Sequence, residues 1–151
     1  MIITLNEIFD SRTVLLNLAG STKETVFQEL VDAIAAVHGE YDRTAMLAAL
    51  WEREKKLSTG IAPGVAIPHA VCGGIGAIAG AIGVSKAGIE YDSLDKNPVH
   101  VIFMLLMGES AKENHLHILD RIVTLVRTEA LALIKNANNA QEVVEILSRF
   151  N

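Results

Sequence analysis

The sequence predicts an α/β fold in which a central mixed β-sheet is flanked by helices. Short apolar runs typical of strands alternate with segments whose apolar residues recur every three or four positions, the spacing of helices. The chain has 151 residues, enough to enclose one hydrophobic core. No linker, low-complexity tract or internal repeat divides it, so we expect a single domain over residues 1–151. The order of the strands is not readable from this pattern.

The first half of the chain predicts one strand and two helices. Residues 13–18 form a short apolar run and predict the strand. Ser21 and Glu24 have the spacing of a capping box, so a helix is expected from there to Gly39. Asp42 predicts the N-cap of the second helix. The side chains expected to face the core from these helices are apolar: Val26, Leu30, Ala33, Ile34 and Val37, then Met46, Leu47, Leu50 and Trp51.

The second half contains the strongest strand signal. Four strands are expected there: 65–67, 77–84, 88–91 and 99–107. Pro68 should end the first of them, because proline cannot donate to a β-ladder, and 92–98 reads as a turn. Ser110 and Glu113 again have capping-box spacing and predict a helix. Its expected inward residues are Leu116, Leu119, Ile122, Val123 and Val126. Two further helices are expected at 129–137 and 140–150.

The charge and composition exclude several classes of function. The net charge is −5 and no basic run is present, which disfavours binding to nucleic acid or to an anionic membrane surface. An acidic protein is suited to a more basic protein partner. Cys72 is the only cysteine, so no internal disulfide can form. Residues 1–10 lack the pattern of a signal peptide, and the longest apolar run, 102–107, is far shorter than the roughly 20 residues of a membrane helix. We therefore expect a cytoplasmic protein without membrane insertion.

The most informative segment is 53–69, Arg-Glu-Lys-Lys-Leu-Ser-Thr-Gly-Ile-Ala-Pro-Gly-Val-Ala-Ile-Pro-His. An apolar strand delivers His69 directly after a proline, at a strand end, where α/β proteins usually place reactive groups. Arg53 ends the preceding helix, and Ser58 and Thr59 lie in a glycine-containing loop. Backbone amides, hydroxyls and a guanidinium together suit an oxyanion such as phosphate. A single histidine after proline is more often structural, so these residues alone do not decide.

The pattern Arg-Glu, three residues, Ser-Thr-Gly, then Gly-Val-Ala-Ile-Pro-His resembles the active-site signature of enzyme IIA domains of the bacterial phosphotransferase system, in their fructose, mannitol and nitrogen-regulatory class. The resemblance extends over the whole chain. It implies that His69 is the phosphorylated histidine and that Arg53 binds the phosphate. One departure is Ala62, where the family commonly has a second glycine.

The resemblance also implies a second active-site histidine, which falls on His115. His117 competes with it, and the two face opposite sides of a helix because residues two apart are rotated by about 200°. Spacing does not choose between them. His38, near a helix end, and His100, in or beside the main strand, are interpreted as structural.

The expected activity is phosphotransfer through phosphohistidine, without a cofactor. Phosphoryl transfer depends mostly on positioning and on stabilising spread negative charge, a role open to Arg53, His115 and the hydroxyls of Ser58 and Thr59. The resemblance implies an HPr-like phosphocarrier protein as donor and a cysteine on a IIB domain, or a regulated target protein, as partner. The nitrogen-regulatory subtype is slightly favoured, because the chain contains no recognisable IIB or IIC segment.

Three alternatives accompany this prediction. The chain could be a sugar-specific IIA component that serves fructose or mannitol uptake. It could be a non-enzymatic binding module of the same fold, which the intact Arg53 and His69 disfavour. A metal hydrolase that uses His69, His115 and a carboxylate has no support from spacing typical of a zinc site.

Overall fold

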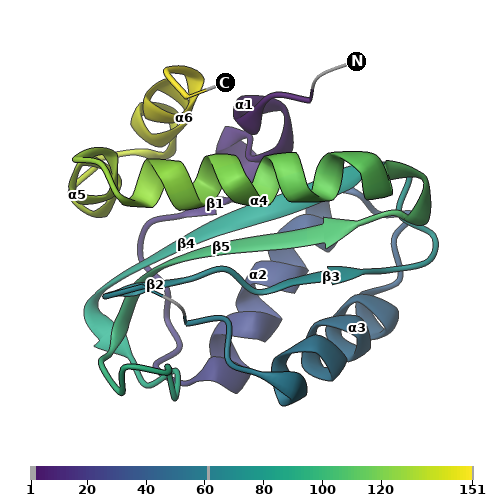
Figure 1. Ribbon diagram of the computed structural model, residues 1–151, viewed down its shortest axis with the longest axis horizontal. Coiled ribbons are helices and arrows are strands. Elements are labelled where there is room, and N and C mark those ends of the chain that lie inside the picture. Colours follow the sequence, from purple (N-terminus) through teal and green to yellow (C-terminus); the bar gives the residue numbers. More distant parts are fainter. Residues whose placement is uncertain (1–2, 61, 151) are drawn as a thin grey trace.

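A mixed five-stranded sheet lies at the centre of the protein between two layers of helices (Figure 1). The computed structural model describes residues 3–60 and 62–150. The strands are β1 Val14–Leu15, β2 Val65–Ala66, β3 His69–Val71, β4 Ile78–Ile89 and β5 Val99–Met107. Strand order is β1-β4-β5-β2, and β3 also pairs with β5. The predicted α/β class with a mixed sheet is therefore confirmed.

The helices divide into two groups according to the sheet face that they cover. They are α1 Leu5–Ile8, α2 Lys23–Val37, α3 Arg43–Lys56, α4 Lys112–Val126, α5 Ala130–Lys135 and α6 Ala140–Ser148. Helices α2 and α3 pack on one face, and α1, α4, α5 and α6 pack on the other (Figure 1). The sequence analysis did not predict α1.

Strand β5 builds both cores because its side chains alternate between the two faces. Phe103 and Leu105 pack toward α4 and α6, whereas Ile102 and Met104 pack toward α2 and α3. All nine residues of β5 except the half-buried His100 are buried. A strand covered on both faces reads as a continuous apolar run, which explains why 99–107 gave the clearest strand prediction.

The edge of the sheet corrects the prediction for Pro68. We expected the chain to leave the sheet there, but His69 instead opens β3, which continues alongside β5. The pairs Ala66↔Ile102 and His69↔Leu105 have the same offset, so β2 and β3 share one register across the proline. The Pro68 carbonyl oxygen still accepts from the amide of Leu105 at 2.9 Å, so the proline costs the ladder only its missing N–H, a loss that an edge strand tolerates.

Two of the three predicted N-caps are wrong. Thr22, not Ser21, caps α2 and shares a capping box with Thr25. Helix α4 has Ala111 at its N-cap without a side-chain bond, because the hydroxyl of Ser110 donates to the carbonyl of Gly76 instead. Asp42 caps α3 by accepting from the amide of Ala45, as predicted.

Several element boundaries and one core residue also differ from expectation. The strand predicted at 13–18 is reduced to β1 because Ser11–Thr13 forms a 3₁₀ turn, and 77–84 and 88–91 join into the single strand β4 across an irregularity. Helix α2 ends at Val37. Leu116 is 78% exposed, so it does not face the core. None of the described helices is long and apolar enough to cross a membrane.

We expect a matched pair of glycine variants to show how tightly the end of β5 is packed. A Cβ on Gly108 would overlap the carbonyl oxygen of Ile75, whereas a Cβ on Gly73 would meet nothing within 4 Å. Gly108→Ala should lower the free energy of unfolding by about 1–3 kcal/mol. Gly73→Ala should change it by less than about 0.5 kcal/mol. Urea unfolding monitored by circular dichroism provides the measurement, and equal midpoints for the two variants would contradict this packing.

Candidate active site

The candidate site is a groove over the edge of the sheet, where the two helical layers meet. Its cavity volume is about 630 Å³. The edge strand β3 provides its floor, the last turns of α3 provide one wall, and the first turns of α4 provide the other. The groove brings together side chains that are far apart in the sequence: Arg53, Lys56, His69, Val71, His115 and Leu116.

The imidazole of His69 is oriented by its own backbone. Its Nδ1 atom lies 2.7 Å from the carbonyl oxygen of Ile67. Because a carbonyl only accepts hydrogen bonds, this contact requires a proton on Nδ1. In a neutral ring the lone pair is then on Nε2. The local turn through Pro68 thus selects one tautomer and leaves the lone pair on Nε2.

The surroundings of His69 favour the neutral ring. Burial lowers the pKa of His69 below its ordinary value, and the charges of Arg53 and His115 act in the same direction. The hydrogen bond to Ile67 and the charge of Glu54 oppose this change. Burial has the largest effect, so the pKa of His69 falls and its unprotonated ring persists at lower pH.

Arg53 is held at the wall of the groove by the end of its own helix. It lies in the last turn of α3, and its Nη1 donates to the carbonyl oxygen of Leu57 at 2.8 Å. This carbonyl belongs to the C-cap residue. The bond orients the planar guanidinium beside His69, where its fork of N–H donors suits a phosphoryl group.

The structure distinguishes the two histidines of α4. His115 lines the groove, while His117 is exposed and is not among the lining residues. The Nε2 atom of His115 is buried and has no hydrogen-bond partner among the described residues. A buried polar atom without a partner is costly, so this nitrogen is suited to a hydrogen bond with a ligand.

The hydroxyls of Ser58 and Thr59 are engaged by the protein itself. The Ser58 hydroxyl accepts from the amide of Gly60 at 3.2 Å. Thr59 is 1% exposed, and its hydroxyl donates to the Glu54 carboxylate at 2.6 Å. Thr59 is therefore removed from the phosphate contacts expected from sequence, because its buried hydroxyl donates to Glu54. The Ser58 hydroxyl only accepts and keeps its proton to donate, so Ser58 stays a predicted contact.

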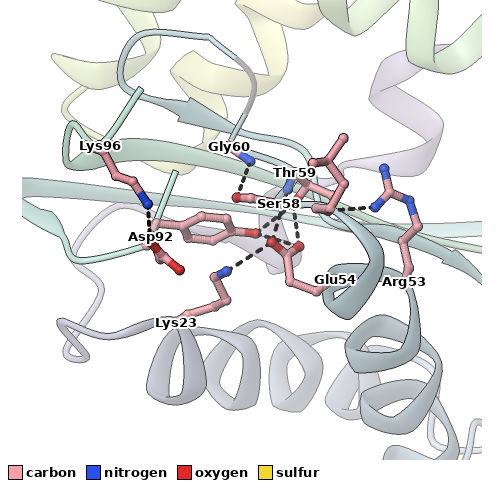
Figure 2. A network of polar contacts seen from close by, with 10 residues as sticks. Lys23, Arg53, Glu54, Ser58, Thr59, Gly60, Asp92 and Lys96 are labelled. Carbon is pink, nitrogen blue, oxygen red and sulfur yellow. Dashed lines mark hydrogen bonds and ion pairs between the residues drawn. The ribbon is translucent and has the colours of Figure 1, made fainter. Parts of the chain in front are cut away.

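Sequence reasoning missed a buried cluster beside the groove, shown in Figure 2. Glu54 is 6% exposed and binds Lys23 of α2 and Thr59 of the following loop. A signal for its burial was present, because position 54 extends the helical stripe of Met46 and Leu50, which are buried. The surrounding charged run at 52–56 hid that signal.

The remaining histidines have structural roles, as predicted. His38 is the C-cap of α2 and stacks on Tyr41 with ring centroids 4.9 Å apart. The Nδ1 atom of His100 lies 2.9 Å from the carbonyl oxygen of Ser85. Within residues 3–60 and 62–150, no three side chains of His, Cys, Asp or Glu gather as a candidate metal site.

Comparison with known families identifies the family to which the chain belongs. Residues 7–150 match the family model described as phosphoenolpyruvate-dependent sugar phosphotransferase system, EIIA 2. The chain belongs to this family. It is therefore a phosphotransfer component of that system, and the groove at His69 lies within the matched residues.

Relatives of both subtypes are similar to this EIIA chain. It is 35% identical over 146 residues to the fructose-specific EIIABC component of Bacillus subtilis, covering 96% of this chain but only 23% of that much longer protein. It is 31% identical over 146 residues to the nitrogen regulatory protein of Pseudomonas aeruginosa, covering 96% of this chain and 95% of that protein.

Solved structures of EIIA proteins share the fold. The nitrogen regulatory protein IIA-Ntr from Neisseria meningitidis has a TM-score of 0.88 and 28% identity, covering 95% of this chain and 98% of that one. The IIA mannitol protein from Escherichia coli has a TM-score of 0.73 at 14% identity, covering 90% of this chain and 96% of that one, which shows likeness of fold alone.

The lowered pKa of His69 predicts an NMR titration midpoint below 6.5, the ordinary value for histidine. Because burial is the main cause, Leu119→Ala should admit water and raise the midpoint toward 6.5, since Leu119 borders the groove and a second cavity of about 130 Å³ beside His69. Leu116→Ala is the matched control and should leave the midpoint unchanged, because Leu116 is 78% exposed. A wild-type midpoint at or above 6.5 would contradict this assignment.

Proposed function

We propose that this EIIA chain accepts a phosphoryl group on Nε2 of His69 from an HPr-like phosphocarrier protein and passes it to a second protein. The observation that carries the proposal is the hydrogen bond of His69 Nδ1 to Ile67, which leaves the Nε2 lone pair available. In the transfer, this lone pair forms an N–P bond while the bond between phosphorus and the donor breaks. The Nδ1 proton stays on the hydrogen bond to the carbonyl oxygen.

Arg53 and His115 are proposed to bind the oxygens of the transferred group. Both line the groove with His69, and each carries N–H groups suited to negative oxygen. A loose transition state spreads negative charge over the equatorial oxygens, so donors already in place lower its energy. His115 is assigned an assisting role, because its Nε2 has no partner among the described residues that would orient it as His69 is oriented.

The apolar side chains of the groove support a protein as the donor of the phosphoryl group and another protein as its acceptor. Val71 and Leu116 line it and are 43% and 78% exposed, which presents apolar surface beside the histidine. Apolar side chains around a reactive group are typical of a surface that a protein partner covers. One solved structure of the same fold is titled a complex of enzyme IIA-mannitol with phosphorylated enzyme IIB-mannitol. A IIB domain is accordingly the partner we propose for a transport role.

Two biological roles follow from the relatives. The nitrogen-regulatory role is supported by the Neisseria structure, which is similar over nearly its whole length. The fructose-transport role is supported by the Bacillus relative, whose identity of 35% exceeds the 31% of the Pseudomonas protein. We place the regulatory role first. Transfer of phosphate to the cysteine of a purified fructose IIB domain distinguishes them, because a regulatory protein should transfer none at a useful rate.

We predict that His69→Ala folds normally and takes up no phosphate when incubated with phosphoenolpyruvate, enzyme I and HPr. His115→Ala should still become labelled, more slowly, because it loses a hydrogen bond to the phosphoryl group and keeps the nucleophile. His117→Ala is the control and should be labelled at the wild-type rate, since His117 is exposed outside the groove. Acid-labile phosphate on the His69→Ala variant would refute the assignment.

We predict that Arg53→Lys slows phosphotransfer by at least about tenfold, because a single positive charge without the planar fork stabilises the transition state less well. The side chain contributes little to the core, so the melting temperature should change by less than about 2 °C. Rapid-quench labelling and thermal denaturation measure the two effects. Wild-type rates would exclude Arg53 from the site.

A further inference from the structure

The buried carboxylate of Glu54 binds four donors from three separate parts of the chain. Its Oε2 accepts from Lys23 Nζ at 3.0 Å and from the amide of Thr59 at 3.0 Å. Its Oε1 accepts from the Thr59 hydroxyl at 2.6 Å and from the Tyr91 hydroxyl at 3.3 Å. Figure 2 shows the Glu54 carboxylate between Lys23 and Thr59, with Arg53 on the far side of the helix end. The cluster joins α2, the end of α3 and the segment after β4.

The donors of this cluster are themselves held in place. The Lys23 ammonium lies 4.5 Å from the centroid of the Tyr91 ring as well as against Glu54. Tyr91 is fully buried, and burial together with the charge of Glu54 raises the pKa of its hydroxyl, which keeps it protonated as a donor. Every oxygen of the carboxylate is therefore satisfied, the condition under which a buried charge is tolerated.

Two hydrogen bonds, both made by the backbone of Ile67, connect Thr59 to the ring of His69. The carbonyl oxygen of Thr59 accepts from the amide of Ile67 at 2.9 Å. The carbonyl oxygen of Ile67 in turn binds Nδ1 of His69 at 2.7 Å. Glu54 binds both the amide and the hydroxyl of Thr59. It thereby fixes Thr59, which holds Ile67, whose carbonyl selects the tautomer of His69.

The same carboxylate is linked to the guanidinium. Arg53 precedes Glu54 in the last turn of α3 and binds the carbonyl of Leu57 at 2.8 Å. Leu57 is extended, with φ −167° and ψ 137°, so the helix stops there and the chain turns directly toward Thr59. Anchoring Thr59 to Glu54 closes the turn of residues 54–59 and holds the Leu57 carbonyl where Arg53 reaches it.

We propose that Glu54, through Thr59, is a positioning residue that sets both the Nδ1–H tautomer of His69 and the place of Arg53 in the groove. The inference rests on the proposed function of His69. Glu54 is not among the residues that line the groove, so it acts through these bonds and not by contact with the phosphoryl group. The proposal gives a physical role to the negative charge of Glu54, which follows Arg53 in the segment 53–69.

The decisive variant is Thr59→Val, which keeps the backbone bonds and the size of the side chain and removes the hydroxyl donor. In wild-type protein, ¹⁵N shifts of the His69 imidazole should show predominantly the Nδ1–H form. Thr59→Val should raise the population of the Nε2–H form at least about threefold. It should also lower kcat for phosphorylation by HPr by up to about 100-fold with KM nearly unchanged, since misplacement within a site affects rate more than docking. Thr59→Ser restores a hydroxyl and should return both values to near wild type.

A second variant and a matched control separate positioning from loss of stability. Glu54→Gln should change the tautomer population in the same direction, because its amide presents N–H groups to donors. Ile134→Ala creates a cavity in α5, in the other helical layer, and should lose stability while keeping the wild-type tautomer and kcat.

The outcomes are distinct. A shift of the tautomer together with a fall in kcat in Thr59→Val, absent from Ile134→Ala, supports the proposal. A wild-type tautomer, a wild-type kcat, or equal effects in Ile134→Ala would overturn it. The tautomer is measured on the unphosphorylated protein. If His69→Ala were still labelled with phosphate, the proposed function of His69 would fail. The effect of Thr59→Val on the tautomer would still show whether Glu54 and Thr59 position the His69 ring.

Discussion

The site depends on one constraint of the sheet: the edge strand must follow β5 through a proline without losing register. The chain meets it by keeping the same register on either side of Pro68, with the pairs Ala66↔Ile102 and His69↔Leu105. Between them, the Ile67 amide turns to Thr59 and the Ile67 carbonyl turns to the His69 ring. Ile67, whose backbone groups lie outside the ladder, thus orients the ring of His69. Both backbone groups of Ile67 point away from β5, to the side of the edge strand that no further strand pairs among the described residues.

The edge location also explains how groups from opposite layers reach the groove in which we propose that phosphate binds. Arg53 belongs to α3 on one face of the sheet, and His115 belongs to α4 on the other. A central strand would separate the two layers. Beside β3 no further strand intervenes among the described residues, so both side chains reach the groove over His69. The exposed apolar side chains next to the histidine leave this edge open to a partner protein.

Patterns that reflect local physics were readable from the sequence. Strand β5 was predicted to the residue because burial on both faces imposes a continuous apolar run, and Asp42 was recognised because its cap requires only a neighbouring amide. Ser110 was misread because its hydroxyl binds Gly76, which is distant in sequence and adjacent only after folding. The partners of Thr59 were missed because they, too, come together only after folding. Its hydroxyl is of a kind that can bind phosphate, but in the folded protein it is buried and donates to Glu54. His115 and His117 were separated only by the packing of α4.

The central claim is that the Ile67 carbonyl holds the Nδ1 proton of His69 and leaves Nε2 as the acceptor of the phosphoryl group. It is tested most directly by identifying the phosphorylated nitrogen in the intact protein. ³¹P and ¹⁵N NMR of protein labelled in the histidine rings and phosphorylated through HPr measures this through the phosphorus–nitrogen coupling. The account predicts phosphorus bonded to Nε2 of His69, with Nδ1 still protonated. Phosphorus bonded to Nδ1 of His69, or to either nitrogen of His115, would contradict it.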